Sequence, residues 1–382
     1  SGTDGLDISF FEKMDSSCFV RRIQNKLKNY YPKSVRRVEI PKPNGKTRPL
    51  GIPCIEDRII QQCIKQILEP ICEAKFHKQS YGFRPNRSTK HAIARCNFLM
   101  WKNNLHYIVN IDIKGFFDNV NHSKLKRQIW HMGIHDKNLI SIIGKILKSE
   151  VQGEGIPIKG TPQGGIISPL LSNIALNELD WWISSQWETF KSKHQYLHPH
   201  IMYRAIKTTR LKQIYFVRYA DDFRIFCKDY KTAQKIFNAT KLWLKERLSL
   251  DINPEKSKII NLRKNYAEFL GIKFRVRMKK DRFVCQSNMC DDAIKRTVQK
   301  LKRQIKIIEK KTEPVEVNKL NAMILGDHNY YNMATNVNLN FQKINFLVTR
   351  TLYNRLKSNL SSKHNLSKAY KRLYGEYNGK KY

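Results

Sequence analysis

The fold is decided by RYADDF (218–223), which lies in the longer stretch IYFVRYADDFRIFC (214–227). Apolar and aromatic residues flank a short polar centre, a pattern that predicts two strands joined by a tight turn. The turn carries the adjacent carboxylates Asp221 and Asp222. Taken alone, such a pair is more often a turn former than part of a functional site.

A third acid lies at the end of another apolar segment. HYIVNID (106–112) predicts a buried strand that ends in Asp112. Carboxylates in apolar surroundings are costly unless a cation compensates them. Asp112 and Asp221 on neighbouring strands would suit two divalent metal ions that they bridge, as in two-metal phosphoryl transfer.

Charge is the strongest compositional signal. The chain has 382 residues, with 71 Lys and Arg against 32 Asp and Glu, so its formal net charge is +39. The excess runs along the whole chain: residues 271–310 hold thirteen Lys and Arg and four acids, and residues 341–382 hold ten and one. Aromatic residues are interleaved with these cations, which favours nucleic acid over an acidic membrane surface as the partner.

Several protein classes are excluded or disfavoured by composition. Hydrophobic residues make up 41% of the chain, which is enough for a sizeable core. There is no apolar run of membrane-spanning length and no secretory signal, so we expect no membrane partner. The eight cysteines are scattered without paired spacing, which fits a reducing, cytoplasmic compartment.

The pattern along the chain predicts two kinds of structure. Helices are expected at 57–71, 123–131 and 137–148 within a mixed α/β part that ends near residue 280. Beyond it, 290–325 and 338–358 predict long basic helices, whereas the polar residues 183–213 predict a long basic loop.

Seven further segments, together with the two acidic ones, occur in the order and spacing typical of one family. The chain resembles the reverse transcriptase/maturase proteins encoded by mobile group II introns of bacteria. The segments that carry the resemblance, besides the two acidic ones, are VRRVEIPKPNGKTRPLGIP (35–53), DRIIQQ (57–62), SYGFRPNRS (80–88), GTPQGGIISPLLSNIALNELD (160–180), LDINPEKSK (250–258), FLGIKF (269–274) and LGDHNYYNMAT (325–335).

The resemblance implies an α+β fold, a right-hand polymerase with an antiparallel palm sheet and helices. It places fingers at 1–105, a palm with the polymerase site at 106–280, and a helical thumb or maturase domain at 281–382. Asp112, Asp221 and Asp222 would be the catalytic aspartates. The ligands of two Mg²⁺ ions, for which Mn²⁺ could substitute, would be Asp112, the carbonyl of Ile113, and Asp221.

The resemblance also implies nucleotide-binding residues. Lys42 and Arg48 match positions that hold the incoming triphosphate, and Phe117 matches a steric gate against a 2′-hydroxyl. Gln163 would pack beside nucleotide and template, and Lys256 would lie near the primer and nucleotide. From the residues alone, surface charge, a core phenylalanine and a plain turn remain the alternatives for these positions.

Contacts to nucleic acid are expected at four further positions. Arg84 and Arg87 would touch the template, with a structural ion pair as an equal alternative. Tyr330 and Tyr331 combine aromatic faces with a basic neighbourhood, which suits base stacking. The histidines of the loop, His194, His198 and His200, favour a solvated loop near RNA over a metal site.

The implied function is an RNA-directed DNA polymerase that also binds its intron RNA as a splicing maturase and supports retromobility. Its partners would be intron RNA, an RNA template with a DNA primer, deoxynucleotides and target DNA, and a homodimer stays open. Two alternatives remain: a non-catalytic RNA-binding splicing factor, and a related reverse transcriptase in defence or DNA repair. Relative to the family pattern we expect most of the N-terminal extension and the C-terminal endonuclease region to be missing, and therefore no DNA cleavage. We expect association with RNA in the cytoplasm or nucleoid.

Overall fold

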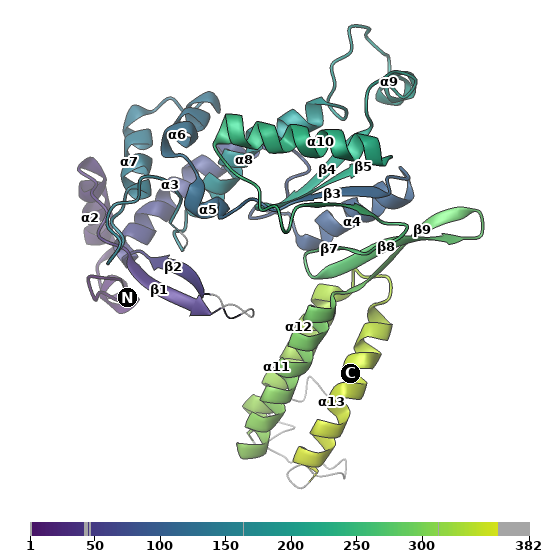
Figure 1. The fold of residues 1–382 in the computed structure, drawn as a ribbon. Coiled ribbons are helices and arrows are strands. Elements are labelled where there is room, and N and C mark those ends of the chain that lie inside the picture. The colour runs from purple at the N-terminus through teal and green to yellow at the C-terminus, as the bar shows by residue number, and fades with distance from the viewer. Residues whose placement is uncertain (1, 42–44, 46, 163, 312, 358–382) are drawn as a thin grey trace. The chain divides into compact units, whose positions relative to one another are not determined.

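The computed structural model describes residues 2–41, 45, 47–162, 164–311 and 313–357, and the chain divides into two compact units. Unit 1 runs to Asn261, and unit 2 begins at Leu262. Figure 1 labels their elements. We describe each unit by itself.

Unit 1 is built around a four-stranded antiparallel sheet in the order β4-β5-β3-β6. A separate two-stranded sheet, β1-β2, precedes it in the chain. The elements of unit 1 are α1 (Ile8–Glu12), α2 (Ser16–Lys28), β1 (Arg36–Pro41), β2 (Thr47–Ile52), α3 (Ile55–Glu73), α4 (Thr89–Trp101), β3 (Tyr107–Ile111), α5 (Phe116–Asn119), α6 (His122–His131), α7 (Lys137–Leu147), α8 (Ser168–Ser185), α9 (Pro199–Ile206), β4 (Ile214–Tyr219), β5 (Asp222–Cys227), α10 (Tyr230–Trp243), a π-helix η1 (Leu244–Leu248) and β6 (Lys258–Asn261).

Apolar side chains from the sheet and from α8 and α10 form one core. Strands β3, β4 and β5 contribute residues that are nearly free of solvent contact, such as Val109, Phe216 and Ile225. On the helices, Trp182 of α8 stacks on Trp243 of α10, with the ring centroids 5.4 Å apart. The tightly packed core makes this sheet a rigid base for the strand ends that carry the acids.

Unit 2 combines a second sheet with three helices. The antiparallel sheet has the order β7-β8-β9, and α11 packs against both α12 and α13. The elements are β7 (Ala267–Phe269), β8 (Ile272–Lys279), β9 (Arg282–Met289), α11 (Asp291–Lys310), α12 (Pro314–Tyr331) and α13 (Val337–Leu356). On α11 the buried residues recur three and four apart, so the basic residues between them face solvent.

The pattern-based predictions of helices and strands are confirmed, with three differences. The unit boundary lies after Asn261 rather than near residue 280, because β7, β8 and β9 pair with one another. The predicted helix 290–325 is two helices, since Pro314 cannot continue α11 and instead begins α12. The predicted loop 183–213 contains α9, which forms because Ile206 is buried in the core.

Among the described residues, no helix has the length and apolar character that a membrane-spanning segment requires. Within the described residues, which include all eight cysteines, no disulfide is formed.

Candidate active site

The acidic pair lies where β4 turns into β5, with Asp221 in the two-residue loop and Asp222 as the first residue of β5. Tyr219 pairs with Asp222, which leaves Ala220 and Asp221 as the loop. Ala220 has φ 58°, in the left-handed region that few residues other than glycine occupy. This backbone is typical of the tight loops that match the twist of antiparallel strands. The loop therefore presents Asp221 and Asp222 at the end of the sheet.

The third acid, Asp112, follows β3, the strand that pairs with β5. Strands β3 and β5 pair Ile111 with Phe223, so the next residues, Asp112 and Asp222, stand opposite each other. Opposite residues of an antiparallel pair point to the same face. Burial raises the pKa of the Asp222 carboxyl above its usual range, and the charge of Asp112 adds to the rise against the opposing effect of Arg224. The structure thus brings Asp112 and Asp222 together, with Asp221 adjoining.

Each of these two opposite carboxylates has a cationic partner. Arg224 donates to Asp222, and the Lys256 ammonium lies 3.7 Å from Oδ2 of Asp112. Lys256 lies in the segment before β6. Two hydrogen bonds hold this segment to Asp112, the residue that follows β3. Asn253 N donates to the Asp112 carbonyl at 2.7 Å, and the Asp112 N–H donates to Oγ of Ser257 at 3.1 Å. Lys256 therefore lies beside an acid of the site, as its predicted role near primer and nucleotide requires.

The donors at this edge fit a hard divalent cation. Carboxylate and carbonyl oxygens, completed by water and substrate phosphates, are what Mg²⁺ prefers. Within the described ranges no cluster of three or more His, Cys, Asp or Glu is arranged as a complete metal site. A polymerase metal does not need one, because the nucleotide phosphates supply part of its coordination. Ile113, the predicted carbonyl ligand, follows Asp112 at an isolated bridge to Ile252.

Phe117, the predicted steric gate, lies on the short helix α5 just beyond Asp112. Its neighbour Phe116 is buried in the core, whereas Phe117 is half-buried. The Phe117 carbonyl accepts a hydrogen bond from Thr161 N at 2.7 Å. That bond holds the Phe117 backbone, while its ring packs edge-on against Phe116, with the centroids 5.4 Å apart, and stays partly exposed; the gate role remains a prediction.

Only some of the residues expected at the nucleotide site belong to the described part of the chain. Lys42 and Gln163 lie outside the described residues. The backbone of Arg48 lies in β2 opposite Ile40. A Cβ on Gly164 would lie 2.2 Å from the Gly51 carbonyl, so the loop after Gln163 approaches the end of β2 closely. That approach brings the two segments that are expected to bind the nucleotide side by side.

Arg84, predicted to touch the template, is instead a structural residue, which corrects that prediction. Its side chain is 2% exposed, and every guanidinium nitrogen donates within the protein. The acceptors are the carboxylate of Glu73 and the carbonyls of His77 and Ser80, at 2.7–3.1 Å. The ion-pair alternative fits, because the side chain is buried and each guanidinium nitrogen already has an acceptor within the protein.

Arg87 is half-buried and differs from Arg84. It donates to the Lys78 carbonyl at 2.7 Å and lies over the Tyr81 ring, 5.6 Å from its centroid. It also lines a cavity with Arg95 and the exposed Phe98. A template contact at Arg87 remains a prediction compatible with this setting.

The two tyrosines of α12 pack against the β7–β8 turn of unit 2. The Tyr330 hydroxyl donates to the Leu270 carbonyl at 3.2 Å, and the Tyr331 hydroxyl lies beside Gly271. Burial raises the pKa of Tyr331. Tyr330 is 37% exposed, so of the two it keeps more surface for a base.

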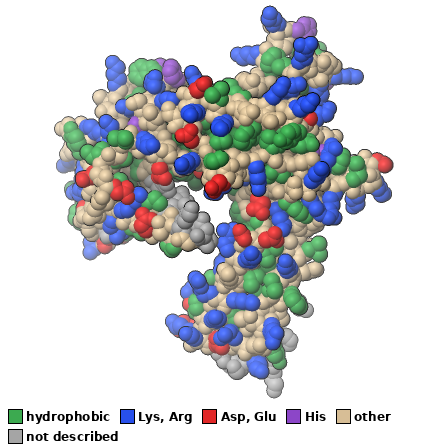
Figure 2. Space-filling model, viewed as in Figure 1, with side chains coloured by type: hydrophobic (Ala, Val, Ile, Leu, Met, Phe, Trp, Pro, Cys, Tyr) green, Lys and Arg blue, Asp and Glu red, His purple; other side chains and the backbone are tan. Residues whose placement is uncertain are grey.

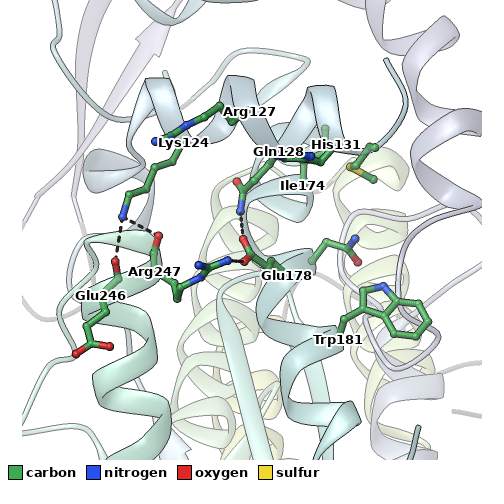
Figure 3. Close-up of a pocket in the computed structure, with 11 residues that line it drawn as sticks. Lys124, Arg127, Gln128, His131, Ile174, Glu178, Trp181, Glu246 and Arg247 are labelled. Atoms are coloured by element: carbon green, nitrogen blue, oxygen red, sulfur yellow. Dashed lines mark hydrogen bonds and ion pairs between the residues drawn. The ribbon is translucent and has the colours of Figure 1, made fainter. Parts of the chain in front are cut away.

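A cavity of about 660 Å³ lies between α6, α8 and η1, away from all predicted site residues (Figure 3). Lys124 there donates to the Arg247 carbonyl at 2.7 Å, and the Arg247 guanidinium donates to Glu178 at 2.6 Å. These two contacts pair polar groups of the cavity with one another. They also link η1 to α6 and to α8.

Two buried charges lie beneath the β4–β5 loop, and the sequence carries only weak signals for them. Arg218 and Asp180 form an ion pair in which each side chain is 1% exposed. The available signals were an arginine inside an apolar strand and an aspartate inside the apolar helix α8. Buried charges in such places require partners.

The family model described as "Reverse transcriptase (RNA-dependent DNA polymerase)" matches residues 40–274. The chain belongs to the reverse transcriptase family. It is 30% identical to the group II intron-encoded protein LtrA of Lactococcus lactis over 90% of this chain and 68% of that protein. It is 34% identical to protein YkfC of Escherichia coli over 64% and 67% of the two chains.

Among solved structures, apo telomerase from Candida tropicalis has the same fold, with a TM-score of 0.50 at 12% identity over 92% of this chain and 68% of that one. The predicted α+β polymerase fold and the predicted membership of the group II intron-encoded reverse transcriptases are confirmed. The chain is an RNA-directed DNA polymerase, an enzyme family that works with divalent metal ions and an RNA template.

Proposed function

We propose that the chain extends a DNA primer along an RNA template with Asp112, Asp221 and Asp222 as its catalytic carboxylates. The observation that supports this most is the placement of Asp112 opposite Asp222 at the strand ends, with the pKa of Asp222 raised in part by the charge of Asp112. Two like charges held close in protein surroundings are unfavourable unless a cation joins them.

The chain's own residues then have distinct tasks. Asp112 and Asp221 would hold the metal ions with the Ile113 carbonyl, and Asp222 would support them from the start of β5. When bound, two Mg²⁺ ions activate the primer 3′-hydroxyl and stabilise the leaving pyrophosphate. Lys256 supplies a positive charge beside Asp112, where the triphosphate would lie. Lys42, Arg48 and Gln163 would complete the nucleotide site, and Phe117 would exclude ribonucleotides.

The test is incorporation of a deoxynucleotide on a DNA-primed RNA template with Mg²⁺. The Asp221→Asn/Asp222→Asn variant should extend no primer, whereas the wild type should. The chain offers a matched control in the adjacent aspartates at the start of α11, which are exposed on unit 2. Asp291→Asn/Asp292→Asn makes the same charge change and should retain extension. Extension by the first variant would overturn the assignment.

We propose further that unit 2 binds folded intron RNA, as a maturase does. Figure 2 shows Lys and Arg side chains over the helices of unit 2. Lys302 and Lys306 of α11 and Arg350 of α13 line one groove of about 530 Å³, together with Arg355 and Glu309. A row of cations along a groove suits a phosphate backbone.

The salt dependence of RNA binding tests this part. Each lost phosphate contact should reduce the slope of log K against log salt by about 0.9. A Lys302→Gln/Lys306→Gln/Arg350→Gln variant should therefore lower the slope by roughly two to three. The control removes three exposed lysines of α10, Lys231, Lys235 and Lys241, and should leave the slope nearly unchanged. Equal effects of both variants would contradict a dedicated RNA groove.

Deoxynucleotides as monomers, target DNA as a further partner, a homodimer, a preference for Mg²⁺ over Mn²⁺ and a cytoplasmic, RNA-associated location stay predictions from the resemblance. The free cysteines and the bacterial relatives support that location.

A further inference from the structure

We infer that Arg218, Asp180 and Asn173 form a buried positioning network that sets the backbone of the catalytic loop and hence the placement of Asp221. The inference rests on the proposed function of the aspartates. Arg218 bonds to the carbonyl of Ala220 in the loop, so the network acts on Asp221 through the loop backbone.

Arg218 is the centre of the network. It lies in β4, two residues before the loop, and its side chain is 1% exposed. Its guanidinium donates to both carboxylate oxygens of Asp180 at 2.6 and 2.7 Å, and to Oδ1 of Asn173 at 2.9 Å. Its Nη1 also donates to the carbonyl of Ala220 at 2.7 Å. Charge-assisted bonds of this planar, forked kind fix geometry as well as charge.

The bond to Ala220 is the one that matters for Asp221. The Ala220 carbonyl belongs to the peptide group that joins Ala220 to Asp221. Fixing that oxygen fixes the plane from which Asp221 extends. Ala220 has a positive φ that an alanine adopts only at a cost, so a partner that holds its carbonyl opposes relaxation of the loop.

A second contact closes the network from the other side. Nδ2 of Asn173 donates to the Gly82 carbonyl at 2.8 Å. A Cβ on Gly82 would lie 2.3 Å from the Ala220 nitrogen, so the Gly82 backbone is packed directly on the loop. The preceding residues run along β4, where Tyr81 N donates to the Arg218 carbonyl at 2.9 Å. The loop is thus held between Arg218 and Gly82, and Asn173 bonds to both.

Helix α8 supplies the rigid support. Asn173 and Asp180 are seven residues apart, so they lie on one face of the helix. Both are buried, as are the apolar residues around them. A buried ion pair is weak evidence for stability as such, because an apolar pair of similar volume often stabilises as well. Its retention beneath the catalytic loop is better explained by the directional bond to Ala220.

The test separates positioning from folding. Arg218→Lys keeps the charge but loses the fork, and it should lower kcat for single-nucleotide incorporation at least about tenfold. The Mg²⁺ concentration for half-maximal rate should rise several-fold, while KM for the deoxynucleotide changes less. A role confined to folding would lower only the fraction of active enzyme and leave the Mg²⁺ dependence unchanged.

A second variant covers the case in which Arg218→Lys does not fold. Asp180→Leu/Arg218→Met removes both charges and leaves an apolar pair, which should fold with a Tm near that of the wild type. It should still show the reduced kcat and the raised Mg²⁺ requirement. The matched control is Arg22→Met/Glu56→Leu, an ion pair between α2 and α3. It should change neither quantity.

The outcomes are distinguishable from a failure of the proposed function. An inactive wild type would overturn the polymerase assignment itself. An active wild type, together with a folded Asp180→Leu/Arg218→Met variant of unchanged kcat and Mg²⁺ dependence, would overturn the positioning network alone.

Discussion

Two hairpins of this protein have two-residue loops of the same backbone type, but only one of the loops carries part of the candidate active site. The β4–β5 loop is Ala220–Asp221, and the β8–β9 loop is Lys280–Asp281. In each loop the first residue has a positive φ, 58° and 53°, and the second is aspartate. Local sequence and backbone therefore do not distinguish them.

The difference lies in what surrounds each loop. Lys280 and Asp281 are exposed, as are the residues on either side of them in unit 2. The loop at Asp221 instead has Gly82 packed on it, Arg218 bonded beneath it and Asp112 across the sheet. The comparison teaches that a carboxylate becomes a catalytic candidate through its neighbours and not through its turn.

The largest effect should come from removing the aspartate of each loop. Asp221→Asn should lower the single-turnover rate of nucleotide incorporation on the order of a thousandfold, because a metal ligand is lost. Asp281→Asn should leave the rate within about twofold, since surface substitutions outside a site have small effects. Similar losses in both variants would remove the contrast between the hairpins.

Lowering the pH should destabilise the protein near the β4–β5 loop, through protonation of His77. Burial, together with nearby cations, lowers the pKa of His77 to about 4, and this histidine begins the segment that packs on the loop. Because the folded state holds His77 neutral, its contribution is present above the unfolded pKa and is lost as pH falls from about 6.5 to about 4. The loss should be about 3 kcal/mol in the free energy of unfolding.

Urea unfolding across this pH range measures the effect. His77→Gln should flatten the dependence, because glutamine does not titrate. An unchanged pH dependence in that variant would show that other groups cause it.

The affinity for Mg²⁺ should also fall as the pH is lowered. The pKa of Asp222 is raised, and only the ionised carboxylate binds a cation, so Mg²⁺ affinity should fall as pH drops through that raised value. The Mg²⁺-induced increase in Tm should therefore vanish at a higher pH than an ordinary aspartate would allow. Asp112→Asn removes the repulsion and should shift the midpoint of the remaining response to lower pH, whereas an unshifted midpoint would argue against coupling of the two acids.

The smallest effect should come from relieving the backbone of each loop. Glycine accepts a positive φ without strain, so Lys280→Gly should change the free energy of unfolding by no more than about 1 kcal/mol and leave the rate unaltered. Ala220→Gly should change stability as little but lower the rate a few-fold, because the catalytic loop gains freedom. Equal rates for the two variants would mean that the loop backbone does not matter.

Much of this arrangement could be predicted from the sequence. The strands that end in Asp112 and flank Asp221 were evident because apolar runs bounded by polar turns have a strong local pattern. The resemblance then assigned roles that pattern alone left open, such as that of Phe117.

Long-range contacts were not predictable in the same way. Arg84 and Arg87 look alike in FRPNRS, yet Glu73 and two carbonyls accept hydrogen bonds from all three guanidinium nitrogens of Arg84. The pairing of Arg218 with Asp180 joins residues 38 apart in the chain. Nothing in the local pattern of either residue specifies the other.

The most direct measurement is single-turnover incorporation of one deoxynucleotide by Asp112→Asn, with primer–template affinity measured on the same preparation. We predict a rate lowered on the order of a thousandfold with affinity unchanged, because the proposal assigns Asp112 to metal binding and not to nucleic acid. A rate within a few-fold of the wild type would contradict the assignment of the catalytic carboxylates.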